Sequence, residues 1–100
     1  MAKVLFTITY DIVPEKRGEY LSLAKEMTNH LAGNKGKNYA IYEQKSKTNS
    51  FSEIFVCNSR EEYDQLEDDQ DEKTEELVSK LESLVLGKMK YSTLFGLDAQ

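Results

Sequence analysis

Four segments of the chain carry the apolar and β-branched residues typical of strands, and two others carry the spacing of half-buried helices. The strand-like segments are residues 3–13, 39–44, 51–57 and 88–95. In three of them, apolar residues occupy both alternating sets of positions. Both faces of the resulting sheet are therefore expected to be at least partly covered.

The first helix is predicted from about residue 15 to residue 31. Pro14 cannot donate to a strand ladder and suits the first turn of a helix, so it separates the two elements. Gly33 is expected to end the helix in the left-handed conformation. The buried stripe is formed by Tyr20, Leu23, Ala24, Met27 and Leu31.

The second helical segment is predicted to be interrupted. It opens with Ser59 and Glu62, which match a capping box in which each side chain satisfies a free N–H group of the other residue. Residues 67–76 contain no apolar side chain, so we expect a short helix, an exposed kink and a longer helix closed by Gly87. The inward positions of the longer helix are Leu77, Leu81, Leu84 and Val85.

This order of elements, β-α-β-β-α-β, predicts one α+β domain over residues 1–100 with the ferredoxin-like arrangement. An antiparallel four-stranded sheet would carry two main helices on one face. Those helices cannot cover both apolar faces, so a second copy packed sheet to sheet is the simplest explanation. The sequence therefore predicts a homodimer.

Composition and charge narrow the class of partner. Of 100 residues, 39% are hydrophobic and 31% are charged, as in an ordered globular domain. Residues 61–76 hold ten acidic residues against Lys73, a local sum of −9 in a chain of net charge −5. The chain shows no basic stripe of the kind that nucleic-acid binding needs, so we expect no nucleic-acid partner. It shows no apolar run of membrane-spanning length and no signal-peptide pattern, so we expect neither membrane insertion nor export. One cysteine fits a reducing cytoplasm.

Several segments together resemble a known family. They are Val13-Pro14 before a helix, the turn at Gly36, the strand 39–43, and the strand-to-capped-helix segment 49–63. Along essentially the whole chain this pattern is similar to the dimeric α/β-barrel superfamily that includes the antibiotic-biosynthesis monooxygenase domains. The resemblance implies two subunits that join their sheets into a barrel, each with a small-molecule pocket between its own sheet and helices.

The chain departs from that family at three landmark positions. Cys57 stands where monooxygenase-like members commonly carry Trp, and Thr9 stands where haem-degrading members carry Asn. The position of their haem-ligating His falls near Asp68 or Asp69. We therefore expect no haem, no metal and no other cofactor.

Three residues are candidate catalytic groups. His30, at the end of the first helix, is the only histidine and would be a general base or ligand at the pocket mouth. The alternative is a half-solvated helix-end histidine. Tyr42 and Tyr91 offer hydroxyls that suit a pocket for aromatic molecules, although tyrosine is also simply a good strand residue.

Further positions are candidates to line the pocket. Thr7, Thr9 and Tyr10 would supply hydroxyls from the first strand, and Cys57 would lie near the cap of the second helix. The alternatives are β-branched filler for the threonines and a buried apolar residue for Cys57. The acidic run 68–72 lacks the glycine and terminal glutamate of a calcium loop, so a solvated face is expected there.

Two functions of different classes remain open at this point. The resemblance implies a cofactor-independent monooxygenase acting on an aromatic or polyketide-like compound. The alternative is a non-catalytic homodimer that binds a ligand or a protein, with the acidic segment as its recognition surface.

Overall fold

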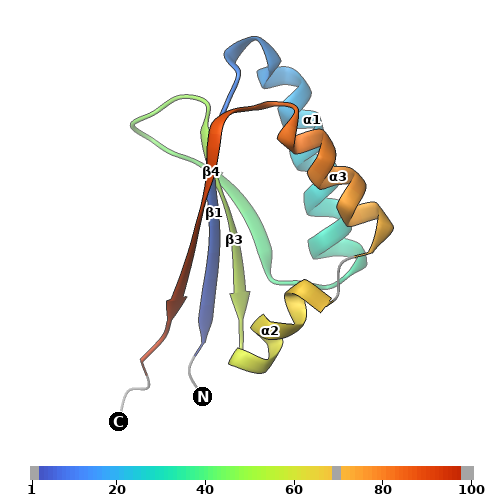
Figure 1. Cartoon of the computed structure of the whole chain (residues 1–100), viewed down its shortest axis with the longest axis vertical. Coiled ribbons are helices and arrows are strands. Elements are labelled where there is room, and N and C mark those ends of the chain that lie inside the picture. The colour runs from blue at the N-terminus through green and yellow to red at the C-terminus, as the bar shows by residue number, and fades with distance from the viewer. Residues whose placement is uncertain (1–2, 69–70, 98–100) are drawn as a thin grey trace.

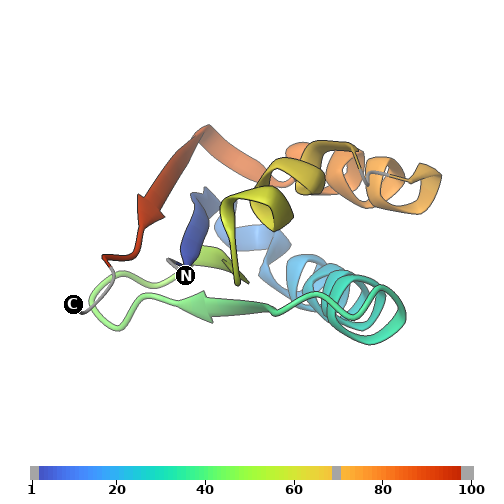
Figure 2. The same cartoon turned by 90° about the horizontal axis from the view of Figure 1, so that it is seen from below.

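The computed structural model describes residues 3–68 and 71–97, and for Glu67 the backbone alone. A four-stranded antiparallel sheet has the order β2-β3-β1-β4, and helices α1, α2 and α3 all lie against one of its faces (Figures 1 and 2). The elements are β1 (Val4–Ile12), α1 (Arg17–Thr28), β2 (Tyr39–Glu43), β3 (Ser50–Cys57), α2 (Arg60–Asp68), α3 (Glu72–Glu82) and β4 (Val85–Phe95). The expected ferredoxin-like α+β fold is confirmed.

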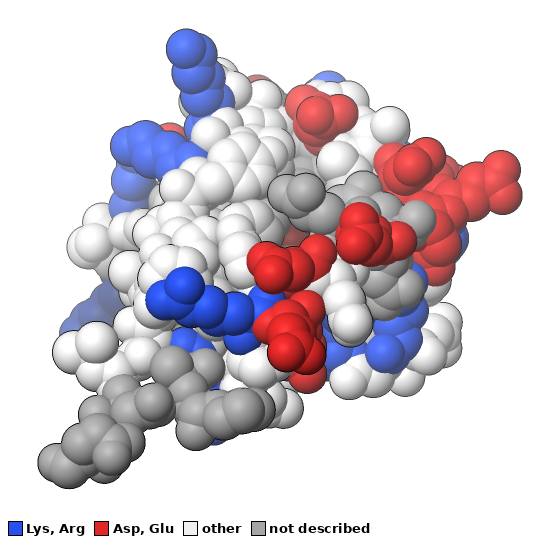
Figure 3. Space-filling model, turned by 60° about the horizontal axis from the view of Figure 1, so that its bottom comes forward, with Lys and Arg blue, Asp and Glu red and all other residues white. Residues whose placement is uncertain are grey.

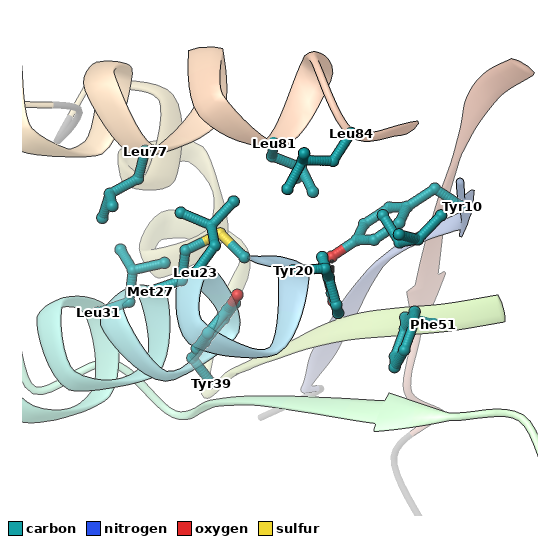
Figure 4. Close-up of a cluster of buried hydrophobic side chains, with 11 residues drawn as sticks. Tyr10, Tyr20, Leu23, Met27, Leu31, Tyr39, Phe51, Leu77, Leu81 and Leu84 are labelled. Atoms are coloured by element: carbon teal, nitrogen blue, oxygen red, sulfur yellow. Dashed lines mark hydrogen bonds between the residues drawn. The ribbon is translucent and has the colours of Figure 1, made fainter. Parts of the chain in front are cut away.

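Strand β1 shows how the sheet separates its two faces. Val4, Phe6, Ile8, Tyr10 and Ile12 point toward the helices, because Val4, Tyr10 and Ile12 join the core and Phe6 and Ile8 line the space beside it. The register places Phe6 opposite Phe55 of β3 and Thr93 of β4, so these residues share the helix-covered face. Figure 4 shows the core that forms between this face, α1 and α3.

The opposite face of the sheet carries a second apolar set. Leu5 lies between Val56 of β3 and Leu94 of β4, and Thr7 lies beside Ile54. Leu94 is 56% exposed, and Leu86 and Tyr42 on the same face are exposed to a similar degree. Unlike the helix-covered face, this outer face has no element of the described chain packed on it (Figure 2).

Helix α1 starts as expected but ends differently. A 3₁₀ turn at Pro14–Lys16 leads into it, with Pro14 in the first helical turn. The expectation that Gly33 ends the helix is wrong: the chain continues as a π-helix over Asn29–Asn34, and Gly36 takes the positive φ of 66°. The wider turn keeps Leu31 on the buried side, at 8% exposure.

The interrupted second helical segment is confirmed. The Glu62 N–H donates to Oγ of Ser59 at 3.2 Å, while the Glu62 carboxylate accepts from the N–H of Asn58 at 2.7 Å, one residue earlier than a capping box requires. After residues 69–70, which lie outside the described part of the chain, Asp71 caps α3 by accepting from the Thr74 N–H at 2.8 Å.

Gly87 does not close a helix, contrary to expectation. Helix α3 ends at Glu82, and Gly87 lies inside β4 with a φ of 84°. The pairing with β1 shifts at this point, from Thr9 opposite Lys90 to Asp11 opposite Leu86. Gly87 therefore serves an irregularity in the strand, where the left-handed conformation bends the edge of the sheet.

The described helices α1, α2 and α3 are short, with 12, 9 and 11 residues, and each carries many polar side chains. None of those within residues 3–68 and 71–97 combines the length and apolar character needed to cross a bilayer.

Candidate functional site

A pocket of about 470 Å³ lies between the helix-covered face of the sheet and helices α1, α2 and α3. Its buried wall includes Met27, Leu77 and Leu81, each at most 2% exposed. Tyr91 and Val78 are its strongly exposed members, so the mouth lies between β4 and α3. The volume falls within the range of pockets that enclose small organic ligands.

Aromatic rings form one wall of this pocket. The rings of Phe6 and Tyr91 lie nearly parallel, with centroids 6.2 Å apart and an interplanar angle of 17°. Phe6 also contacts Phe55 at 6.1 Å and Tyr63 at 5.8 Å. Such a surface favours a flat, largely apolar ligand, because stacked and tilted ring contacts add to the burial of apolar area.

Two hydroxyl groups join α2 to β4 at this wall. Tyr63 Oη and Thr93 Oγ1 lie 3.0 Å apart and share a hydrogen bond, and both residues line the pocket. Lys37, which precedes β2, is the cationic side chain at the pocket among the described residues. The polar groups around the pocket are thus few and come from different elements.

Glu53 is the most informative of these groups. It points inward from β3, is only 4% exposed, and lines the pocket. The hydroxyl of Tyr39 donates to its Oε1 at 2.7 Å, while Oε2 has no hydrogen-bond partner within residues 3–68 and 71–97. A buried carboxyl with one unpaired oxygen is costly, so it indicates a functional site more than a structural one.

The surroundings of Glu53 shift its protonation. Burial raises the pKa of the carboxyl, because a low-dielectric site disfavours the charged form, and the hydroxyls of Tyr39 and Tyr10 oppose this effect in part. Burial and the nearby Glu53 raise the pKa values of Tyr10 and Tyr39. Both tyrosines therefore stay neutral, and Glu53 is the carboxyl here that can exchange a proton with a ligand.

Some sequence-predicted residues lie away from this pocket. Tyr91 lines it, whereas Thr7 and Thr9 point to the outer face of the sheet, where Thr9 Oγ1 meets Ser52 Oγ at 3.0 Å. Tyr42 also lies on the outer face, 58% exposed. We expected these three residues at the pocket, but the strand register places them on the opposite face, because alternate residues of a strand face opposite sides of the sheet.

The other predicted residues have structural partners. Tyr10 is buried beside the pocket, with its hydroxyl 2.8 Å from that of Tyr20 (Figure 4). His30 Nε2 lies 3.2 Å from both carboxylate oxygens of Asp71, so it joins the π-helix that follows α1 to the cap of α3, and it does not line the pocket. Cys57 lines a separate depression of about 260 Å³, and burial raises the pKa of its thiol, which opposes thiolate chemistry.

Glu53 is not among the residues predicted from the sequence to line the pocket, although the sequence carries a signal for it. In the strand 51–57, Phe51, Glu53 and Phe55 share one alternating set, and an acidic residue in phase with two phenylalanines is an anomaly. Anomalies of this kind mark buried polar groups that need a reason.

Unlike the buried Glu53, several acidic residues of the second helical segment lie on the surface. Glu61, Glu62 and Asp64 on α2 and Glu72, Glu75 and Glu76 on α3 are all exposed. In Figure 3, the acidic side chains, in red, gather in the centre and on the right of the view. Among the side chains that the structure describes, which leave out those of Glu67, Asp69 and Asp98, no three His, Cys, Asp or Glu residues are grouped as metal ligands would be.

Solved structures share this architecture. A protein from Mycobacterium tuberculosis, Rv0793, superposes with a TM-score of 0.76 at 16% identity, covering 97% of each chain. An antibiotic biosynthesis monooxygenase gives 0.71 at 19% identity, covering 100% of this chain and 99% of its own. A Bacteroides thetaiotaomicron VPI-5482 protein of unknown function, described as a possible oxidoreductase, gives 0.74 at 16% identity, covering 94% and 97%.

No protein-family model matches the chain, and no curated protein sequence matches it. The similarity therefore lies in the fold. The chain shares its ferredoxin-like fold with these three solved structures, over nearly its full length.

Proposed function

We propose that this protein is a cofactor-independent monooxygenase that acts on a neutral aromatic or polyketide-like compound. The observation that carries the proposal is the buried carboxyl of Glu53, with its unpaired Oε2, in an aromatic-walled pocket of about 470 Å³. The fold of a solved antibiotic biosynthesis monooxygenase supports the reaction class. The chemistry itself is argued from the pocket.

The first step is proton transfer from carbon to Glu53. The substrate presents a C–H bond made acidic by a neighbouring carbonyl or aromatic system, and Oε2 of the ionised carboxyl takes the proton. The electron pair stays on the substrate and delocalises onto its oxygen. Lys37 and the Tyr63–Thr93 hydroxyl pair line the pocket and would stabilise that developing charge.

Oxygen is the second substrate. The carbanion forms a C–O bond to O₂, and the terminal oxygen of the resulting peroxide receives the proton back from Glu53. Loss of water from this hydroperoxide leaves a carbonyl at the same carbon. In balance, a CH₂ group and one O₂ give a C=O group and one H₂O.

The proposed assembly is a homodimer that joins the two outer sheet faces. Leu5, Ile54, Val56 and Leu94 form a continuous apolar set across β3, β1 and β4, with Leu94 more than half exposed. Packing this face against a second copy would remove that area from water. Cys57 is a free, buried thiol, which suits the cytoplasm, where we place the protein.

The alternative function, a non-catalytic binding module, uses the same pocket without the oxygen step. It gains from one observation: acidic residues of α2 and α3 are exposed together and could recognise a basic partner. The two functions differ in one measurable respect, since only the monooxygenase consumes oxygen.

The test is oxygen uptake with a panel of hydroxylated polycyclic aromatic ketones that contain an acidic CH₂ group. Glu53→Gln keeps the shape of the side chain and removes its basicity, so uptake should fall by at least about 100-fold. The matched control is Glu26→Gln, an exposed glutamate on α1 that should leave uptake unchanged. Full uptake by Glu53→Gln would refute the proposal; ligand binding without uptake by the native protein would leave the binding module.

A further inference from the structure

Tyr39 and Glu53 form a contact that does more than fill the core. Tyr39 is the first residue of β2, is 5% exposed, and packs its ring against Phe55 at a centroid distance of 4.7 Å. The ring is thereby fixed, and its hydroxyl, which points into the space between sheet and helices (Figure 4), donates to Oε1 of Glu53 at 2.7 Å. A donor held by packing can orient the group that accepts from it.

We propose that Tyr39 is the positioning residue of the site: its hydrogen bond holds Oε1 of Glu53 and leaves Oε2 as the oxygen that exchanges a proton with the ligand. This inference rests on the proposed role of Glu53. It adds which of the two carboxyl oxygens reacts and which residue decides this.

The argument follows from donors and lone pairs. The hydroxyl of Tyr39 donates to Oε1, so a proton carried by the carboxyl belongs on the other oxygen. Of the two carboxyl oxygens, Oε2 is the one without a hydrogen-bond partner in the described chain, and Glu53 lines the pocket. Loss of the Tyr39 hydroxyl would free the carboxyl to rotate and would expose either oxygen to the ligand.

The other groups around Glu53 cannot replace Tyr39. Tyr10 of β1 faces the carboxyl, but its hydroxyl is paired with Tyr20 of α1 at 2.8 Å and makes the weaker interaction with Glu53. Lys37 lies at the pocket on the segment before β2. Across the pocket, the hydroxyl of Tyr63 from α2 is bonded to Thr93 of β4, with Tyr91 at the rim and Thr74 of α3 completing the polar lining.

The hydrogen bond from Tyr39 and the burial of Glu53 shift the pKa of this carboxyl in opposite directions. The Tyr39 hydroxyl stabilises the charged carboxylate, so it lowers the pKa of Glu53 against the larger, raising effect of burial. Removing the hydroxyl alone, with the ring retained, should therefore raise the pKa of Glu53 further. A purely structural contact would change stability and leave this titration in place.

The experiment is a ¹³C NMR titration of the side-chain carboxyl of Glu53, in protein labelled at glutamate and assigned with Glu53→Gln. Tyr39→Phe should move the midpoint to higher pH, and Tyr10→Phe should move it the same way by less. Tyr42→Phe, at an exposed tyrosine of the same strand as Tyr39 that lies on the outer face of the sheet, is the matched control and should leave it unchanged. An unchanged midpoint in a folded Tyr39→Phe protein would overturn the inference. If Tyr39→Phe does not fold, 3-fluorotyrosine at position 39 keeps the ring and makes its hydroxyl a stronger donor, so the Glu53 midpoint should move to lower pH; an unchanged midpoint there would also overturn the inference.

The rate of oxygen uptake separates this inference from the proposed function. If both hold, the pH at which uptake rises to half its maximum should shift upward in Tyr39→Phe by the same amount as the NMR midpoint. If Glu53→Gln retains uptake, the proposed function fails, while the NMR titration still decides whether Tyr39 sets the state of Glu53. If the NMR midpoint shifts in Tyr39→Phe but the pH dependence of oxygen uptake does not, Oε2 of Glu53 is not the reacting atom.

Discussion

The hydroxyl of Tyr63 on α2 lies 3.0 Å from the hydroxyl of Thr93 on β4, and this hydrogen bond joins a short helix to the edge strand beside the pocket. Tyr63 also packs its ring on Phe6 of β1. α2 is nine residues long, and its exposed side is strongly acidic. These two contacts are therefore well placed to hold the helix over the pocket.

Breaking this bond should loosen α2. Tyr63→Phe and Thr93→Val should each lower the free energy of unfolding by about 1 kcal/mol, because each removes one partner of a partly buried hydrogen bond. The double variant should cost less than the sum of the two, since the bond can be lost only once. Urea unfolding of all four proteins measures this coupling; strictly additive losses would show that the hydroxyls do not interact.

Stability should respond to pH through Glu53. A carboxyl whose pKa is raised by folding contributes stability below its ordinary pKa of about 4.5 and loses it as the pH rises through the folded value. Relative to Glu53→Gln, the native protein should become less stable as the pH rises from 4.5 toward and through the raised folded pKa of Glu53. Denaturant unfolding across that range tests this, and a pH-independent difference would contradict it.

An ion pair on the other side of the molecule acts in a separate pH window. Arg17 binds both carboxylate oxygens of Glu43, and this contact, together with the N–H of Asn49, lowers the pKa of Glu43 to about 2. A lowered pKa gives stability that is present above pH 4.5 and lost as the pH falls toward 2. In Arg17→Met, the free energy of unfolding should therefore fall less between pH 4.5 and pH 2 than it does in the native protein. The pH dependence above 4.5, which comes from Glu53, should stay unchanged.

The outer sheet face should control assembly. Leu94→Asp places a charge in the apolar set that the proposed dimer buries, so sedimentation velocity should show a monomer where the native protein shows a dimer. Leu21→Asp is the matched control, because Leu21 is an exposed leucine on α1, 47% accessible, away from this face. A native protein that sediments as a monomer at micromolar concentration would contradict the dimer itself.

Two glycines should respond in opposite directions to alanine. Gly87 has a φ of 84°, so Gly87→Ala should destabilise by about 1 kcal/mol although its Cβ would meet no atom within 4 Å. Gly18 lies in α1 with equally open space and no positive φ, so Gly18→Ala should stabilise by about 0.5 kcal/mol. Thermal unfolding of both variants tests whether Gly87 is retained for its backbone conformation.

Much of the fold could be predicted because its elements rest on periodicity. The alternation in β1 placed Val4, Phe6, Ile8 and Tyr10 on one face, and the absence of apolar residues in 67–76 predicted the break between α2 and α3. Glycines were less informative. Gly33 and Gly87 both suited helix ends, but the π-turn after α1 and the shifted register of β4 depend on tertiary packing.

The site was harder to predict for the same reason. Hydroxyl-bearing residues could be placed on strands, but which strand face meets the helices decides whether they reach a pocket, and this excluded Thr7, Thr9 and Tyr42. Glu53 requires the opposite reasoning, from an acidic residue that shares the alternating set of Phe51 and Phe55. Its partner Tyr39 lies 14 residues away, and local sequence does not reveal that contact.

The pocket can be tested directly through its two methionines. Met27 of α1 and Met89 of β4 both line it, so their ¹³C-labelled methyl groups, assigned with Met27→Leu and Met89→Leu, report on a ligand from two elements. In a titration with 2-naphthol, a neutral hydroxylated aromatic, both signals should shift along one binding curve, and Glu53→Gln should change its affinity. If neither methyl responds up to the solubility limit of a panel of such compounds, the pocket is not a small-molecule site.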